Sequence, residues 1–255
     1  MDLSLFQLTN IILVALLLFL AGRFLWMALF HPVNQPAAWK EARRAKRVPV
    51  SLIRLERFYS DKVRFFTWWL QTERLHRDKV PGAFAELGVY KGDSARLLHL
   101  MDPARKLYLF DTFEGFPGVD LLGETGKAAT YTTRNFADTS VSKVLRRIKG
   151  NDLLRICPGY FPDSAAPVAG ETFALVNIDA DLYKPTRAGL EFFYPRMSSG
   201  GVILVHDYNR KWPGVVRAAD EFLLTIPEFP VLIPDLDGTL VIIKMDDANR
   251  LRSQS

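Results

Sequence analysis

The pattern of apolar and polar positions divides the chain into one unbroken apolar stretch and a long alternating body. Residues 3–22 carry no charged side chain, and residues 11–22 (IILVALLLFLAG) are wholly apolar. At about 1.5 Å per residue, a helix of this length spans about 30 Å, the thickness of a bilayer core. The pattern therefore predicts a transmembrane helix within residues 1–30. A buried core helix is the alternative, and a signal peptide is disfavoured because no Lys or Arg precedes the apolar run.

From residue 81 onward, short apolar runs alternate with stretches of helical spacing. The runs that predict strands are AFAELG, KLYLFDT, LLRICPG, FALVNID and GGVILVHD, and helical spacing occurs at residues 93–101, 140–148 and 185–197. Strand–helix–strand repetition predicts a parallel sheet with helices on both faces. Two further apolar runs flank Asp237-Gly238, which is typical of a hairpin. We therefore expect an α/β fold whose mostly parallel, seven-stranded sheet ends in an antiparallel hairpin.

Four segments follow from these patterns. They are an anchor at residues 1–30, a basic linker and helical lead-in at 31–80, an α/β domain at 81–247 and a tail at 248–255. The lead-in is rich in aromatic residues, Trp68 and Trp69 among them. These predict core-facing helix positions, with a substrate lid or a dimer face as alternatives.

The net charge of +5 is local rather than general. Residues 31–79 carry twelve Lys or Arg and five Asp or Glu, a surplus of seven, so the remainder of the chain is slightly acidic. A basic segment directly after an apolar helix indicates a membrane flank rather than a nucleic-acid groove. By the positive-inside rule, the body of the protein is expected on the cytoplasmic side of a single-pass membrane protein.

Cysteine and histidine usage excludes two classes of site. The single cysteine, Cys157, rules out an internal disulfide. Four scattered histidines and one cysteine also exclude a structural zinc site of the Cys/His type.

Acidic residues follow two of the predicted strands. Asp179 and Asp181 come after FALVNI, and Asp207 ends GGVILVHD. In open parallel sheets, ligands bind outside the carboxyl ends of the strands. One strand–helix–strand crossover separates Asp179 from Asp207, so both acids are expected at the same edge. Asp181 has a competing interpretation as a cap for the helix that follows.

The first two predicted strands end in a second group of candidates. Gly88 and Gly92 lie in a strand-to-helix turn and would let the backbone approach a ligand closely, although a tight structural turn explains them equally well. Asp111 ends the second strand, where this type of fold commonly places an acid on ribose hydroxyls. Its alternative role is to cap the turn that follows.

The segments LFDTFEGFPG, PGYFPDS, NIDADLYKPTRAGLEFFYPRMSSGG and VHDYN resemble the macrocin O-methyltransferase family, whose members use S-adenosylmethionine (SAM) to methylate sugar hydroxyls. The resemblance covers residues 81–245. It implies a Rossmann-like class I methyltransferase fold with SAM across the strand ends, and it suggests self-association into a homo-oligomer. Together with the turn, it indicates these cofactor-binding residues: Glu86, Gly88, Gly92, Ser94, Asp111, Phe161 and Asp163.

The same resemblance implies a metal and a base. Asp179 and Asp207 match positions that hold Mg²⁺, and the Asp179 position carries a base role. His206 stands where the family usually has a second acid, so it departs from the pattern. We take His206 as a candidate metal ligand and base, with a histidine held by hydrogen bonds at the strand end, or a site that has lost its metal, as alternatives.

The sequence therefore predicts a membrane-anchored, SAM-dependent O-methyltransferase whose acceptor is a small-molecule or lipid-linked sugar, with no nucleic-acid partner. Two other functions stay open. Asp179-Ala-Asp181 resembles the D-x-D of glycosyltransferases that bind nucleotide sugars. A non-catalytic scaffold that keeps only the SAM fold is the second alternative.

Overall fold

The computed structural model describes residues 4–30 and 35–245, without the side chains of residues 27–30. The predicted tail at 248–255 lies outside the described residues. The chain divides into two compact units between Arg47 and Val48. Residues 48–80 of the predicted lead-in thus belong to the same unit as the sheet.

In the part of the first unit that the structure describes there are two helices. Helix α1 (Leu5–Phe30) includes a 22-residue apolar segment, Leu5–Trp26, with a mean hydropathy of 2.3 and no buried residue. By length and composition α1 could cross a membrane, and the exposure of its described side chains disfavours a core helix. Helix α2 (Ala37–Arg44) buries Trp39 and Ala42, and its basic side chains are exposed.

The second unit is a seven-stranded sheet in the order β3-β2-β1-β4-β5-β7-β6. The strands are β1 (Ala83–Leu87), β2 (Leu107–Asp111), β3 (Leu154–Pro158), β4 (Phe173–Ile178), β5 (Met197–Val205), β6 (Val231–Ile233) and β7 (Thr239–Ile243). The first five are parallel, whereas β7 pairs antiparallel with both β5 and β6. This confirms the predicted mostly parallel sheet and its C-terminal antiparallel hairpin.

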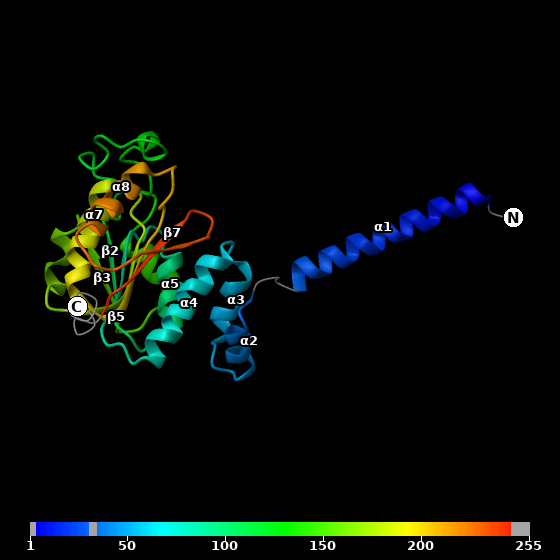
Figure 1. The fold of residues 1–255 in the computed structure, drawn as a ribbon, viewed down its shortest axis with the longest axis horizontal. Coiled ribbons are helices and arrows are strands. Elements are labelled where there is room, and N and C mark those ends of the chain that lie inside the picture. The colour runs from blue at the N-terminus through cyan, green and yellow to red at the C-terminus, as the bar shows by residue number, and fades with distance from the viewer. Residues whose placement is uncertain (1–3, 31–34, 246–255) are drawn as a thin grey trace. The chain divides into compact units, whose positions relative to one another are not determined.

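Helices cover both faces of this sheet (Figure 1). They are α3 (Val50–Phe58), α4 (Lys62–Arg77), α5 (Asp93–Met101), α6 (Val141–Ile148), α7 (Tyr183–Phe193) and α8 (Pro213–Leu223), with short 3₁₀ turns at Ala128–Thr130, Asp163–Val168 and Tyr194–Arg196. Helices α7 and α8 pack together on one face, and α4 and α5 lie on the other (Figure 1). Every residue of β1 and β4 is buried, as is typical of central parallel strands.

The helix predicted at residues 185–197 begins two residues earlier and ends four residues earlier, as α7. Pro185 lies within the first turn, where a missing N–H costs nothing. At the other end a 3₁₀ turn follows, and Met197 already begins β5.

The strand register determines how the carboxyl ends of the strands lie relative to one another. Leu87 at the end of β1 pairs with Phe110 of β2 and with Ile178 of β4, and Ile178 pairs with Val205 of β5. The carboxyl ends of four neighbouring strands therefore lie level. The residues that follow these strands meet in one place.

Candidate active site

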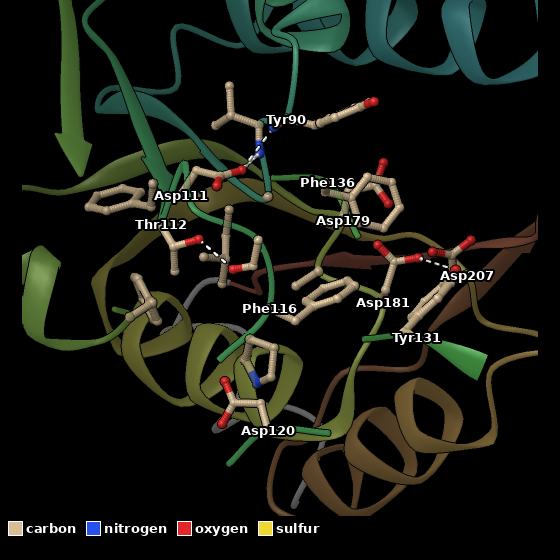
Figure 2. A pocket seen from close by; sticks show the side chains of 18 of the residues that line it. Tyr90, Asp111, Thr112, Phe116, Asp120, Tyr131, Phe136, Asp179, Asp181 and Asp207 are labelled. Carbon is tan, nitrogen blue, oxygen red and sulfur yellow. Dashed lines mark hydrogen bonds between the residues drawn. The ribbon is translucent and has the colours of Figure 1, made fainter. Parts of the chain in front are cut away.

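A cavity of about 400 Å³ opens at the carboxyl ends of β1, β2, β4 and β5 (Figure 2). This volume is in the range of small-molecule sites. Gly88, Asp111, Asp179 and Asp207, which follow or end these strands, all line the cavity. The edge that the sequence predicted as the functional one is therefore the edge that carries the cavity.

Gly88, directly after β1, lies against the backbone of Asp179, directly after β4. Its φ is +87°, and a Cβ built there would lie 1.9 Å from the backbone oxygen of Asp179. Only glycine fits this approach. The backbone N–H of Asp179 also donates to Leu87 at 2.8 Å. The glycine turn thus fixes where Asp179 leaves the sheet.

Asp111 lines the cavity and also shapes its wall. Its Oδ2 accepts the backbone N–H groups of Val89 and Tyr90, each at 2.8 Å (Figure 2). Its Oδ1 accepts the backbone N–H of Phe113 at 2.7 Å. Asp111 therefore caps the turn that follows, and its side chain also lines the cavity.

The seven expected cofactor residues separate into two groups. Gly88, Ser94, Asp111 and Phe161 line the cavity, whereas Glu86, Gly92 and Asp163 do not. Gly92, with φ +80°, precedes α5 and lies against Val144. Asp163 is exposed at the start of a 3₁₀ turn. Direct cofactor contact is therefore expected from the first group.

Glu86 lies beneath the cavity floor and is fully buried. The Asn177 side-chain amide donates to its Oε1 at 2.8 Å. Burial raises the pKa of Glu86 to about 8, against a hydrogen bond from Ser94 that lowers it. Ser94 lines the cavity, whereas Glu86 itself does not.

Replacing Glu86 with Gln is expected to make stability less dependent on pH. Folded Glu86 keeps its proton up to about pH 8, whereas the unfolded side chain loses it near its ordinary pKa. The contribution of Glu86 to the free energy of unfolding therefore falls as pH rises through this window, by about 3 kcal/mol from pH 5 to pH 8. Urea unfolding at both pH values measures the difference, with the exposed Glu114→Gln as control. If the free energy of unfolding of Glu86→Gln fell between pH 5 and pH 8 as much as that of the wild type, the raised pKa of Glu86 would be contradicted.

Three carboxylates converge on the other side of the cavity. One ligand oxygen each from Asp179, Asp181 and Asp207 lies within 4.8 Å of the others. Asp181 and Asp207 adopt left-handed backbone conformations (φ +61° and +60°) that turn them off the strand ends. Burial raises the pKa of each of the three acids, and the charge of Asp179 raises those of the other two further. The Tyr131 hydroxyl donates to Asp181 at 3.3 Å (Figure 2).

His206 lies apart from this cluster. It is 1% exposed and does not line the cavity. Its Nδ1 is 2.7 Å from the Thr239 hydroxyl and its Nε2 is 2.5 Å from Asn177 Oδ1, which also accepts the Trp68 indole N–H at 3.0 Å. Burial holds the pKa of His206 well below its usual value. The structure thus corresponds to the alternative of a histidine held by hydrogen bonds, and Asp181 takes the third place that we expected for His206.

Three residues at the cavity, Arg64, Asp237 and Phe116, were not singled out as site residues from the sequence. Arg64 of α4 lines it, as does Asp237 of the β6–β7 turn. Phe116 stacks on Tyr131 at 5.3 Å between ring centroids, and Phe136 packs edge-on against both (Figure 2). Arg64 lies in a segment interpreted only as basic and helical, and Asp237 was interpreted only as part of a turn.

Comparisons with known proteins show which family this chain is similar to. The family model described as macrocin O-methyltransferase (TylF) matches residues 62–229. Demethyldecarbamoylnovobiocin O-methyltransferase of Streptomyces niveus is 32% identical over 156 residues, 57% of this chain and 59% of that protein. Mycinamicin III 3''-O-methyltransferase of Micromonospora griseorubida is 31% identical over 145 residues, 52% of this chain and 57% of that protein. The chain thus spans a little over half the length of these curated relatives.

Solved structures show the same fold. The O-methyltransferase NovP superposes with a TM-score of 0.63 at 27% identity, over 72% of this chain and 81% of its own. The calicheamicin methyltransferase CalS11 gives a TM-score of 0.56 at 23% identity, over 88% of this chain and 91% of its own.

Proposed function

Because this chain belongs to the macrocin O-methyltransferase (TylF) family, we propose that it is a SAM-dependent O-methyltransferase that acts on a sugar hydroxyl. The observation that carries the proposal is the single cavity that brings Gly88, Ser94 and Asp111 together with Asp179. It supplies a place for the cofactor beside a cluster of carboxylates. Family membership argues against the glycosyltransferase alternative.

Different residues of the cavity are assigned different roles in methyl transfer. SAM supplies an electrophilic methyl group, and the protein must align a hydroxyl oxygen with it. Asp179 is the proposed base that takes the hydroxyl proton. Burial raises its pKa, which makes it a stronger proton acceptor than an exposed aspartate. The stacked rings of Phe116 and Tyr131 offer an apolar wall for the acceptor.

We further propose that Asp179, Asp181 and Asp207 hold a divalent cation, with Mg²⁺ as the candidate. Their oxygens are the hard donors that Mg²⁺ prefers, and they lie close enough together to share one ion. A bound cation would relieve the repulsion that raises the pKa values of Asp181 and Asp207. The chemistry that it would supply is a lower pKa of the acceptor hydroxyl.

The proposal extends to the membrane. Helix α1 is long and apolar enough to span a bilayer, and exposed basic residues of α2 follow it. We propose a single-pass protein with its catalytic body on the cytoplasmic side, a membrane-proximal or lipid-linked sugar as acceptor, and self-association into a homo-oligomer. Retention in the membrane pellet after carbonate extraction would support the anchor, and release into the supernatant would contradict it.

Calorimetry with S-adenosylhomocysteine (SAH) and transfer of a labelled methyl group from SAM test the enzymatic function. We expect SAH to bind in the micromolar range, and methyl transfer to at least one acceptor from a panel that includes demethyldecarbamoylnovobiocin and mycinamicin III. A nucleotide sugar serves as the comparison ligand. Absence of SAH binding, or tighter binding of the nucleotide sugar, would overturn the proposal.

A further inference from the structure

Arg64 places a positive charge beside the carboxylate cluster. Its guanidinium lines the cavity and its side chain is 13% exposed. Nη1 lies 3.8 Å from Asp179 Oδ2, Nη2 lies 3.7 Å from Asp237 Oδ2, and Nε donates to Asp235 Oδ2 at 3.1 Å. One arginine therefore joins the end of β4 to two acids of the β6–β7 turn.

Both the backbone and the side chain of Arg64 are held by hydrogen bonds. Asp61 caps α4, since its Oδ1 accepts the Arg64 backbone N–H at 2.9 Å and its Oδ2 accepts that of Leu236 at 2.8 Å. Asp235 is fully buried and also accepts the Thr239 hydroxyl. The first turn of α4 is thus fastened to the β6–β7 turn by contacts on both sides of Arg64. The guanidinium has little freedom to leave the cluster.

The charge of Arg64 acts on the acids that we assign to the metal. It lowers the pKa of both Asp179 and Asp207, against the burial that raises them. Among the described residues, the other cations that line the cavity are Lys91 and Lys127, and Lys91 is engaged by Asp138 at 2.6 Å. Of these three cations, Arg64 is the one that forms an ion pair with a member of the cluster among the described residues.

We propose that Arg64 is the internal counter-cation of the carboxylate cluster: it holds Asp179 by ion pairing and weakens the binding of a divalent cation there. The inference rests on the proposed function, because it takes the cluster as a metal site. A fixed guanidinium near Asp179 repels an incoming ion and shares the carboxylate that the ion needs. Arg64 thereby makes metal binding weaker than three carboxylates alone would give.

Titration of the full-length, detergent-purified protein with Mn²⁺, followed by electron paramagnetic resonance, tests the proposal. We expect Arg64→Gln to bind Mn²⁺ at least tenfold more tightly than the wild type, because Gln still donates to Asp235 but carries no charge. Arg64→Lys keeps the charge and should stay within about threefold of the wild type. Arg74→Gln is the matched control, since Arg74 lies on the same helix but donates to the Gly200 carbonyl at 2.7 Å.

The outcomes separate this role from a purely structural one. Unchanged or weaker Mn²⁺ binding in Arg64→Gln, with SAH affinity within twofold of the wild type, would overturn the proposal, as would no Mn²⁺ binding in either protein. If Arg64→Gln loses SAH binding, Arg64→Gln/Asp235→Asn is compared with Asp235→Asn, because neutralising both partners leaves no buried charge unpaired. The proposal then requires that Arg64→Gln/Asp235→Asn bind Mn²⁺ more tightly than Asp235→Asn does. Failure of SAH binding in the wild type would overturn the enzymatic function, while the Mn²⁺ comparison would still decide the role of Arg64.

Discussion

Replacing Asp179 with Asn is expected to lower the rate of methyl transfer about a thousandfold and to leave SAH affinity within about twofold. A positioned general base contributes between about 10² and 10⁴-fold to a proton-transfer step, and Asn can accept no proton at neutral pH. Asn keeps the size of Asp, and the backbone N–H that bonds to Leu87 is untouched. Turnover with labelled SAM measures the rate, and calorimetry measures SAH binding.

Two further variants test whether the loss of turnover is specific to Asp179. Asp152→Asn alters an exposed acid just before β3, at the opposite edge of the sheet, and should leave turnover unchanged. Asp181→Asn removes a second member of the cluster and should lower turnover less, since Asp181 also accepts the Tyr131 hydroxyl. Turnover of Asp179→Asn within tenfold of the wild type would rule out the proposed base.

Much of the fold could be predicted because the two central strands, β1 and β4, are buried along their whole length. In such a sheet a continuous apolar run is a buried strand. An acid directly after the run must lie where the strand ends, at the carboxyl-end edge of the sheet, because burying an unpaired charge is costly. Asp179 and Asp207 were placed correctly at the cavity by this reasoning alone. The boundaries of α7 and β5 were less certain, because a 3₁₀ turn between them carries no distinct pattern.

The details of the site depended on backbone geometry that apolar patterns do not encode. His206 and Asp207 are neighbours at the end of β5, and sequence alone does not say which one faces the cavity. The left-handed backbone of Asp207 turns it toward Asp181, while His206 points inward to Asn177 and Thr239.

Hydrogen bonds between residues far apart in the sequence could not be predicted either. Arg64 and Asp235 are 171 residues apart, and their hydrogen bond exists only because α4 packs beside the β6–β7 turn. No local spacing in the sequence indicates such a pair. The family resemblance does not reveal it either, because that resemblance was traced only from residue 81 onward and Arg64 lies before it.

Replacing Gly88 with Ala is expected to cost at least 3 kcal/mol of stability and more than tenfold in SAH affinity. A left-handed conformation costs a residue with a Cβ about 1–2 kcal/mol. The larger part comes from overlap, since the new Cβ would lie 1.9 Å from the backbone oxygen of Asp179 and 2.7 Å from its carbonyl carbon. Backbone atoms cannot rotate away as a side chain can, so the end of β4 must move and carry Asp179 with it.

Thermal unfolding and SAH calorimetry measure the two effects, and Gly123→Ala separates their causes. Gly123 has a similar φ of +80°, but a Cβ there would meet no atom within 4 Å. Gly123→Ala should therefore show the conformational cost alone and keep full SAH affinity. At about 2–4 °C per kcal/mol for a unit of this size, Gly88→Ala should melt about 6–12 °C below the wild type. Equal losses in the two variants would mean that the close approach of Gly88 to Asp179 does not hold Asp179 in place.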